Sequence, residues 1–208
     1  MADIVLSVPT AGGEGQVHLA VGGPAGSVAG LLCLGHGAGG NITAPDLQAV
    51  RAAAVQAGWT VALVEQPYRV AGRRAQGPAP HLDAAWIEIV AAIRADHAGP
   101  LVVGGRSSGA RIACRTAAAT GAVGVVCLAF PLRPPQRPEQ SRAAELAAVS
   151  APVLVVQGER DQFGGPVELR AELPAGPEVV GVRGDHALRA ATAEVGALVT
   201  AWLSRFAG

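Results

Sequence analysis

Short apolar stretches alternate with longer amphipathic segments along most of the chain. The continuously apolar stretches are residues 28–34, 60–64, 101–104, 123–129, 153–156 and 178–182. This pattern is typical of strands buried on both faces, as in a parallel sheet. The segments between them have helical periodicity and comprise residues 45–56, 82–94, 110–120, 141–148, 166–173 and 187–206. The alternation predicts an α/β fold: one mostly parallel sheet, with helices on both faces.

The first part of the chain has a different pattern. Residues 4–8 and 16–21 alternate apolar and polar positions on either side of a glycine-rich turn, which predicts an antiparallel hairpin. In open α/β sheets, ligands bind outside the carboxyl ends of the strands. Residues 67–80 and 131–138 are rich in Pro, Gly and Arg, and each segment follows a strand. We therefore expect both loops on the ligand side.

The length and charge of the chain limit the number of domains and the kinds of partner that the protein can have. A chain of 208 residues fits a single domain, residues 1–208, and has no internal repeat or break in composition. Its 16 basic residues are all arginine, balance 16 acidic residues and form no basic block. Nucleic acid and anionic membranes are therefore not expected partners, and no apolar run is long enough to span a bilayer. A small-molecule substrate is the expected partner.

The N-terminus and the cysteines indicate where the protein resides. Asp3 stands where a secretory signal has cations, and Pro9 ends the first apolar stretch, so we expect a cytoplasmic protein. Cys33, Cys114 and Cys127 lie singly in apolar segments, without the spacing of a metal site. They are expected to be buried, reduced thiols. We expect neither a metal ion nor a cofactor.

A candidate nucleophile lies directly after the predicted strand 101–104. Residues 105–109 read Gly-Arg-Ser-Ser-Gly and fit Gly-x-Ser-x-Gly, a sharp strand-to-helix turn that exposes its central serine, here Ser107. The pattern alone is weak, but it stands between a strand and a helix, as the motif requires. Ser108 is disfavoured, because Arg106 would then occupy the first small position. The alternative is a flexible turn without chemistry.

A serine nucleophile needs a general base and an acid that orients it. Asp161 and His186 each follow a predicted strand, so both are expected at the edge of the sheet that carries Ser107. Glu159 competes with Asp161 for the acid role. We expect Asp185 to shape a turn, because its carboxylate cannot readily reach the ring of its own neighbour.

Acyl transfer also requires donors for the oxyanion. Residues 35–41, Gly-His-Gly-Ala-Gly-Gly-Asn, follow the strand 28–34, and their glycines allow backbone N–H groups to turn toward a ligand. We expect the oxyanion donors to be the N–H groups of Ala38 and Ser108. His36 shapes this loop or contacts substrate. The loop lacks the pattern of a phosphate-binding or dinucleotide-binding motif.

With these motifs together, the sequence resembles the α/β-hydrolase superfamily, and within it the compact branch similar to dienelactone hydrolases. Hydrolase-like domains of a testis-expressed protein and of a chromatin-complex subunit are related to the same branch. The resemblance covers nearly the whole chain and rests on residues 36–40, 104–111, 130–135, 157–164 and 184–186. It implies an eight-stranded α/β-hydrolase fold with a catalytic triad of Ser107, Asp161 and His186. It implies no particular substrate.

The loops give expectations about substrate size and charge. Only about twenty residues separate the strand 123–129 from the strand at 153–156, so we expect no large lid. An open site favours small esters, thioesters or lactones. Among the loop arginines, Arg73 and Arg133 are candidates to hold an anionic group of the substrate, and the alternative is simple solubilising charge.

Two functions remain open from the sequence. The first is a serine hydrolase, an esterase that works through an acyl-enzyme formed on Ser107. The second is a non-catalytic interaction module that keeps the hydrolase scaffold. The complete set of Ser, Asp and His at three separate loops favours the enzyme.

Overall fold

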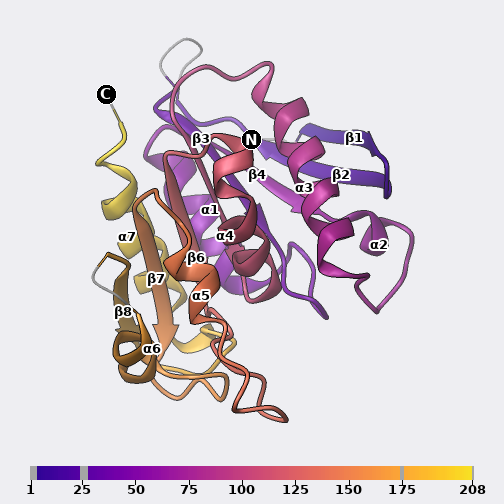
Figure 1. Cartoon of the computed structure of the whole chain (residues 1–208). Coiled ribbons are helices and arrows are strands. Elements are labelled where there is room, and N and C mark those ends of the chain that lie inside the picture. Colours follow the sequence, from indigo (N-terminus) through magenta and orange to yellow (C-terminus); the bar gives the residue numbers. More distant parts are fainter. Residues whose placement is uncertain (1–3, 24–27, 174–175, 208) are drawn as a thin grey trace.

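The described part of the chain is built around one eight-stranded sheet. The computed structural model describes residues 4–23, 28–173 and 176–207. Its strands are β1 (Ile4–Thr10), β2 (Gly13–Ala20), β3 (Gly30–Gly35), β4 (Trp59–Glu65), β5 (Leu101–Arg106), β6 (Gly124–Leu128), β7 (Val153–Gly158) and β8 (Glu178–Val182). They are ordered β1-β2-β4-β3-β5-β6-β7-β8 across the sheet (Figure 1). This is the expected α/β-hydrolase architecture.

The pairing of the strands follows the change of pattern along the sequence. β1 pairs with β2, and β2 with β4, in antiparallel registers, whereas the pairs from β4 through β3, β5, β6 and β7 to β8 are parallel. β3 and β6 are buried along their whole length. Their continuous apolar sequence therefore reflects burial on both faces of the sheet.

Helices cover both faces of the sheet. They are α1 (Pro45–Gln56), α2 (Pro67–Val70), α3 (Ala79–Arg94), α4 (Ser108–Thr120), α5 (Ala143–Ala147), α6 (Pro166–Glu172) and α7 (Thr192–Leu203). One core cluster joins Trp86 of α3 and Ile112 of α4 to the sheet. The other core cluster joins Leu47 of α1 and Val199 of α7 to the opposite face. Figure 1 shows α1 and α7 behind the sheet, with α3, α4 and α5 in front.

Two helix predictions differ from the structure. The short helix α2 lies within residues 67–80, for which the sequence predicts a loop; it begins at Pro67, whose fixed φ suits the first helical position. The last helix was expected over residues 187–206, but α7 begins at Thr192, after a 3₁₀ turn at Arg189–Ala191. Leu188 has a φ of 54°, which interrupts right-handed helical geometry.

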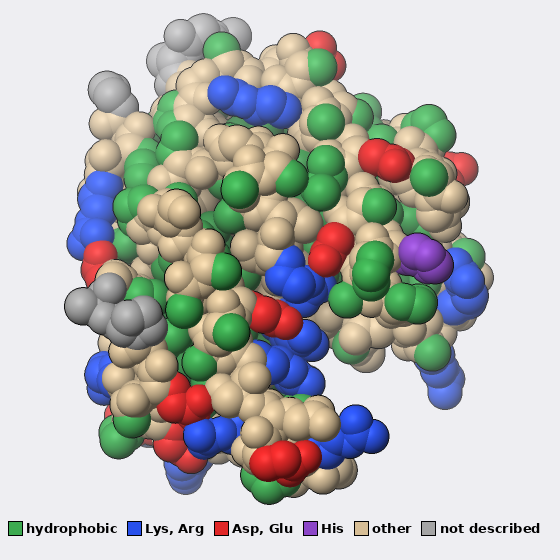
Figure 2. Space-filling view, in the orientation of Figure 1, with side chains coloured by type: hydrophobic (Ala, Val, Ile, Leu, Met, Phe, Trp, Pro, Cys, Tyr) green, Lys and Arg blue, Asp and Glu red, His purple; other side chains and the backbone are tan. Residues whose placement is uncertain are grey.

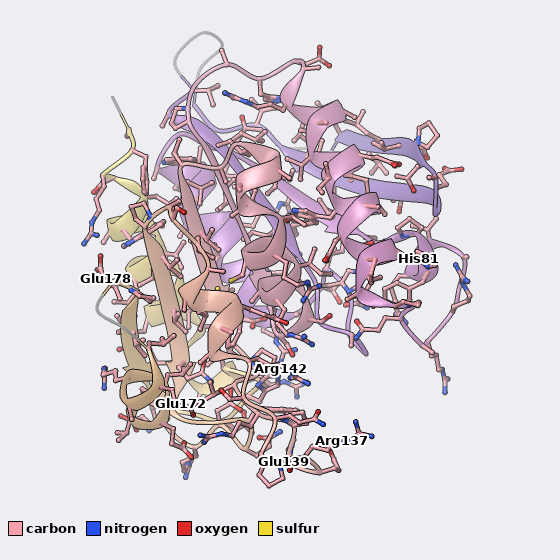
Figure 3. All side chains as sticks on the ribbon, in the orientation of Figure 1. His81, Arg137, Glu139, Arg142, Glu172 and Glu178 are labelled. Atoms are coloured by element: carbon pink, nitrogen blue, oxygen red, sulfur yellow. The ribbon has the colours of Figure 1, made fainter. Side chains whose placement is uncertain are left out.

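The loops at the carboxyl edge border a hollow in the molecule. Figure 2 shows it between the segment after β6 and the α2–α3 region. Arg137 and Glu139 lie on one side of it, and His81 lies on the other (Figure 3). The segment between β6 and β7 contains only the short helix α5, so no large lid covers this edge. Within the described residues, none of the helices is long and apolar enough to cross a membrane.

Candidate active site

Ser107 stands at a strained turn between β5 and α4. Its backbone has a φ of 53° and a ψ of −110°, which a residue with a side chain rarely adopts. The turn packs tightly against β3: a Cβ on Gly109 would lie 2.4 Å from the carbonyl oxygen of Gly35, and a Cβ on Gly105 would lie 2.5 Å from the same atom. Glycines at 105 and 109 therefore permit the close approach that turns the serine outward.

A continuous hydrogen-bonded chain joins Ser107, His186 and Asp161. The Oγ of Ser107 lies 2.9 Å from Nε2 of His186. Nδ1 of the same ring lies 2.8 Å from Oδ2 of Asp161. The Asp161 side chain is fully buried, whereas that of His186 is 13% exposed. The structure thus brings together three side chains that lie far apart in the sequence, in the arrangement that a catalytic triad of serine, histidine and aspartate has.

Further contacts hold the Asp161 carboxylate. Nε2 of the buried Gln157 lies 2.9 Å from Oδ2 of Asp161, and the backbone N–H of Phe163 donates to Oδ1 at 2.8 Å. The ring of Phe163 packs on the imidazole of His186, with centroids 4.4 Å apart. Both the carboxylate and the imidazole are therefore held in place before any substrate arrives. Neither Gln157 nor Phe163 stands out in the sequence by its residue type, although both lie in the motif segment 157–164.

The competing residues have other partners. Asp185 accepts a hydrogen bond from the N–H of Ala187 at 2.9 Å, as a turn residue does. The hydroxyl of Ser108 donates to Oε1 of Gln76 at 2.7 Å. The carboxylate that contacts His186 is that of Asp161, two residues beyond Glu159.

The loop after β3 lies directly beside Ser107. A Cβ on Gly37 would be 3.5 Å from Cβ of Ser107, which places the neighbouring residue Ala38 at the edge of the site. The hydroxyl of Tyr68, from α2, donates to the carbonyl oxygen of Ala38 at 2.9 Å and so orients the peptide bond between Ala38 and Gly39. Ser108 is the first residue of α4, where an N–H has no acceptor within the helix. Both proposed oxyanion donors thus belong to segments that flank Ser107.

The position of His36 favours the first of its two expected roles, shaping the loop, over contact with substrate. It is 3% exposed, and burial lowers the pKa of its imidazole. Nδ1 lies 2.8 Å from the carbonyl oxygen of Gly37, and Nε2 accepts the N–H of Gln66 at 3.3 Å. A neutral ring that donates from Nδ1 satisfies both contacts. His36 therefore joins the loop after β3 to the end of β4.

The two candidate arginines differ in their surroundings. The guanidinium of Arg133 forms an ion pair with Glu172, so its charge is already balanced, which argues against its role as the anion-binding residue. Arg73 is exposed and lines a cavity between α2 and α3. Of the two, Arg73 is the better candidate to bind an anionic group, because it is exposed at the wall of a cavity.

Arg106 has an extensive set of contacts that the sequence did not reveal. Its Nε lies 2.9 Å from Oδ2 of Asp46, in the first turn of α1, and Asp46 is fully buried. Its Nη2 donates to the carbonyl oxygen of His186 at 2.8 Å. Burial raises the pKa of Asp46, and the positive charge of Arg106 opposes this shift. One guanidinium thus connects α1, the turn of Ser107 and the loop of His186.

We expect the Arg106→Gln variant to lose about 3–5 kcal/mol of unfolding free energy at neutral pH, because the Asp46 carboxylate stays buried without its cation. Without Arg106 the pKa of Asp46 rises further, so the folded state binds a proton more readily than the unfolded state. The loss should therefore shrink at acidic pH, where Asp46 is protonated, and grow as the pH rises through the folded pKa. Urea unfolding at about pH 5 and about pH 7.5 measures this difference.

The matched control is the double variant Asp46→Asn/Arg106→Gln. Removing both charges leaves no buried ion, so this protein should recover much of the lost stability and most of the pH dependence should disappear. A double variant as unstable as Arg106→Gln alone, with the same pH dependence, would contradict the assigned role of the ion pair.

Among the described residues, no group of three or more His, Cys, Asp or Glu side chains is arranged to hold a metal ion. The three cysteines are buried as free thiols, and burial raises the pKa of Cys33 to about 12. A thiol with such a pKa is a poor nucleophile at neutral pH. Cys33 is therefore not a candidate nucleophile.

Comparison with known proteins gives the same picture of the fold. A family model described as an alpha/beta hydrolase domain matches residues 28–202. A lidless serine hydrolase of this class from Xanthomonas campestris superposes with a TM-score of 0.82 at 17% identity, covering 100% of this chain and 96% of that one. A dienelactone hydrolase from Anabaena variabilis gives a TM-score of 0.75 at 19% identity, with 99% and 98% covered.

A third similar structure is Est1E from Butyrivibrio proteoclasticus, which has also been solved with ferulic acid bound. That complex superposes with a TM-score of 0.81 at 14% identity, covering 97% of this chain and 98% of that one. At these identities the likeness concerns the fold. Comparison with curated protein sequences gives no significant match.

Proposed function

The chain belongs to the alpha/beta hydrolase family, and on that basis we propose that it is a serine hydrolase that cleaves small ester, thioester or lactone substrates through an acyl-enzyme formed on Ser107. The observation that carries the proposal is the hydrogen-bonded chain from Ser107 through His186 to Asp161. These three groups in this order are what a serine nucleophile needs at neutral pH.

The proposed reaction has two halves. Nε2 of His186 takes the proton from the Ser107 hydroxyl as Oγ bonds to the acyl carbon, and the buried Asp161 carboxylate stabilises the imidazolium. The N–H groups of Ala38 and Ser108 donate to the oxyanion. The bond to the leaving group then breaks, and His186 donates its proton to that group. A water molecule attacks the acyl-enzyme by the same steps, which releases the acid and restores Ser107.

Two features support small substrates. The carboxyl edge has no lid insertion between β6 and β7, so the nucleophile is reached from an open surface. The similar structures include a lidless serine hydrolase, a dienelactone hydrolase and an esterase solved with ferulic acid. Esters and lactones of compact acids therefore agree with both the site and the fold.

A fluorophosphonate probe tests the proposal, because it labels only a serine activated as a nucleophile. The wild-type protein should gain one phosphonyl group on Ser107, detected by mass spectrometry of the peptides, and Ser107→Ala should remain unlabelled. Ser150→Ala is the matched control, since Ser150 is exposed and precedes β7 at the opposite edge of the sheet. A wild type that stays unlabelled and leaves short p-nitrophenyl esters intact would instead favour an interaction module.

A further inference from the structure

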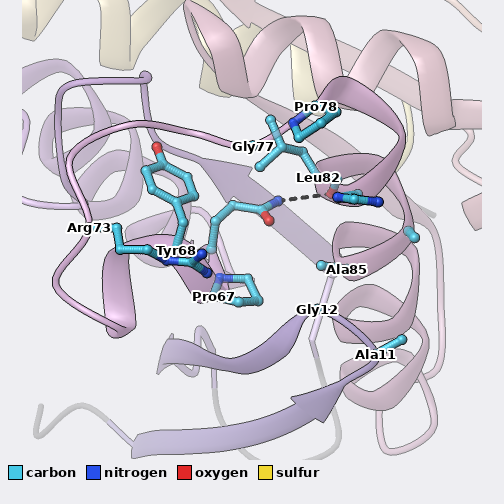
Figure 4. Close-up of a pocket in the computed structure, with 12 residues that line it drawn as sticks. Ala11, Gly12, Pro67, Tyr68, Arg73, Gly77, Pro78, Leu82 and Ala85 are labelled. Atoms are coloured by element: carbon cyan, nitrogen blue, oxygen red, sulfur yellow. Dashed lines mark hydrogen bonds between the residues drawn. The ribbon is translucent and has the colours of Figure 1, made fainter.

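A cavity of about 450 Å³ lies beside the active site, at the carboxyl edge of β4. Its walls come from the β1–β2 turn, from α2 with the residue before it, from the loop 73–78 and from the first turns of α3 (Figure 4). Ser107, Asp161 and His186 are not among its lining residues. Its volume is within the range of cavities that bind small molecules.

One buried polar group in its wall lacks a partner. Gln66 is 3% exposed, and its Nε2 donates to the carbonyl oxygen of Leu82 at 3.2 Å, the dashed line in Figure 4. Because Nε2 is the donor in that contact, the other amide atom is the acceptor Oε1. Among the described residues, Oε1 has no hydrogen-bond partner. Buried acceptors are normally satisfied, so a ligand that supplied a donor to this atom would meet an unfilled hydrogen-bond position.

The remaining lining is mostly apolar, with one cation at the rim. Pro67, Leu82 and Ala85 contribute apolar surface. The exposed Arg73 has no ion-pair partner within the described part of the chain. A fitting ligand therefore has a compact apolar body and a hydroxyl or N–H donor, and Arg73 favours a negative substituent near the opening.

The cavity is close enough to Ser107 to receive part of a substrate. β3 alone separates β4 from β5, so the ends of these strands lie about 10 Å apart at the usual strand spacing. Tyr68 lines the cavity and also donates to Ala38, and Gln76 joins the loop 73–78 to Ser108. Hydrogen bonds from Tyr68 and from the loop 73–78 thus connect the cavity to the two segments that flank Ser107.

We propose that this cavity is the subsite for the acyl end of the substrate, and that it selects acids whose far end is a compact apolar group bearing a hydroxyl or N–H donor for Gln66. This inference rests on the proposed function. It assigns Gln66 the recognition of that donor and Arg73 the preference for acids with an additional negative charge.

The test compares p-nitrophenyl esters of 3-(4-hydroxyphenyl)propanoic acid and 3-phenylpropanoic acid. Wild type should prefer the hydroxylated ester by about tenfold in kcat/KM, because only its hydroxyl satisfies Oε1. In Gln66→Met, which keeps the backbone N–H to His36, the ratio should fall to about one. Equal rates for the two esters in wild type would overturn the inference.

Two further variants probe the cavity without disturbing Gln66. A Cβ on Gly77 would meet no atom within 4 Å, so Gly77→Leu extends a side chain from the cavity wall without strain at the backbone. The Gly77→Leu variant should lower kcat/KM for both p-nitrophenyl arylpropanoates more than for p-nitrophenyl acetate. Arg73→Gln should reduce the rate for the 4-carboxyphenyl analogue about tenfold, whereas Arg74→Gln, the exposed neighbour outside the lining, should not.

Binding separates failure of this inference from failure of the proposed function. Calorimetry of Ser107→Ala with the two free acids repeats the comparison without turnover, and the hydroxylated acid should bind about tenfold more tightly. Probe labelling of Ser107 with equal binding of both acids would leave the hydrolase proposal standing and overturn the subsite. Unequal binding by a protein that resists the probe would overturn the hydrolase proposal and leave only a cavity that selects the hydroxylated acid.

Discussion

Replacing Ser107 by alanine is expected to lower kcat for short p-nitrophenyl esters on the order of 10⁶-fold, because the residual rate then comes only from binding and the oxyanion donors. The change removes the atom that lies 2.9 Å from Nε2 of His186 and leaves the turn in place. Steady-state kinetics on enzyme purified to remove host esterases gives the ratio. KM should change far less than kcat, since the serine acts on the transition state.

Stability is the control for the Ser107 variant. Alanine adopts the same strained backbone as serine, and one hydrogen bond is lost, so the free energy of unfolding should change by no more than about 1 kcal/mol. A variant that keeps a tenth of the wild-type kcat would exclude Ser107 as the nucleophile. A variant that unfolds would be compared with Ser107→Cys, which retains a nucleophilic atom.

Replacing Asp161 by asparagine is the second large effect, an expected loss of about 10⁴-fold in kcat. An amide in this position presents an N–H₂ group to His186 or to Gln157, both of which donate to the carboxylate oxygen Oδ2. The imidazole is then stabilised in the wrong tautomer, with Nε2 protonated and unable to accept the serine proton. The value of kcat and the rate of fluorophosphonate labelling should fall together.

Glu159→Gln is the matched control for Asp161→Asn. It removes one carboxylate from the same loop at a residue that does not contact His186, so kcat should stay within about threefold of wild type. If Glu159→Gln lost activity and Asp161→Asn retained it, the acid would be misassigned. The pair of variants thus decides between the two carboxylates that the sequence left open.

The sequence was sufficient for the sheet because its strands are locally encoded. The runs around residues 31–34 and 153–156 are apolar at every position, and the structure buries them on both faces. Convergence of Ser107 and His186 could be anticipated because each follows a parallel strand, and such strands end at one edge. The approach of these two loops to each other follows from the sheet topology.

Other features depend on contacts that local patterns do not contain. Arg106 contacts the carbonyl oxygen of His186 across 80 positions of sequence, and no periodicity reports such a pair. Asp46, in the first turn of α1, has the appearance of an ordinary helix-start acid in the sequence. His36 was left between two roles because its burial depends on Tyr68 and Gln66, which belong to a distant segment. The roles of these three residues depend on tertiary packing, which a local sequence pattern does not contain.

The backbone of Ser107 has a consequence for laboratory evolution. Glycine adopts a φ of 53° without the steric cost that serine has there, so Ser107→Gly is expected to raise the free energy of unfolding by about 0.5–1 kcal/mol. A screen that selects only for protein that stays folded at high temperature would enrich the Ser107→Gly variant, which lacks the serine hydroxyl. Only a screen that also scores turnover would keep the hydroxyl.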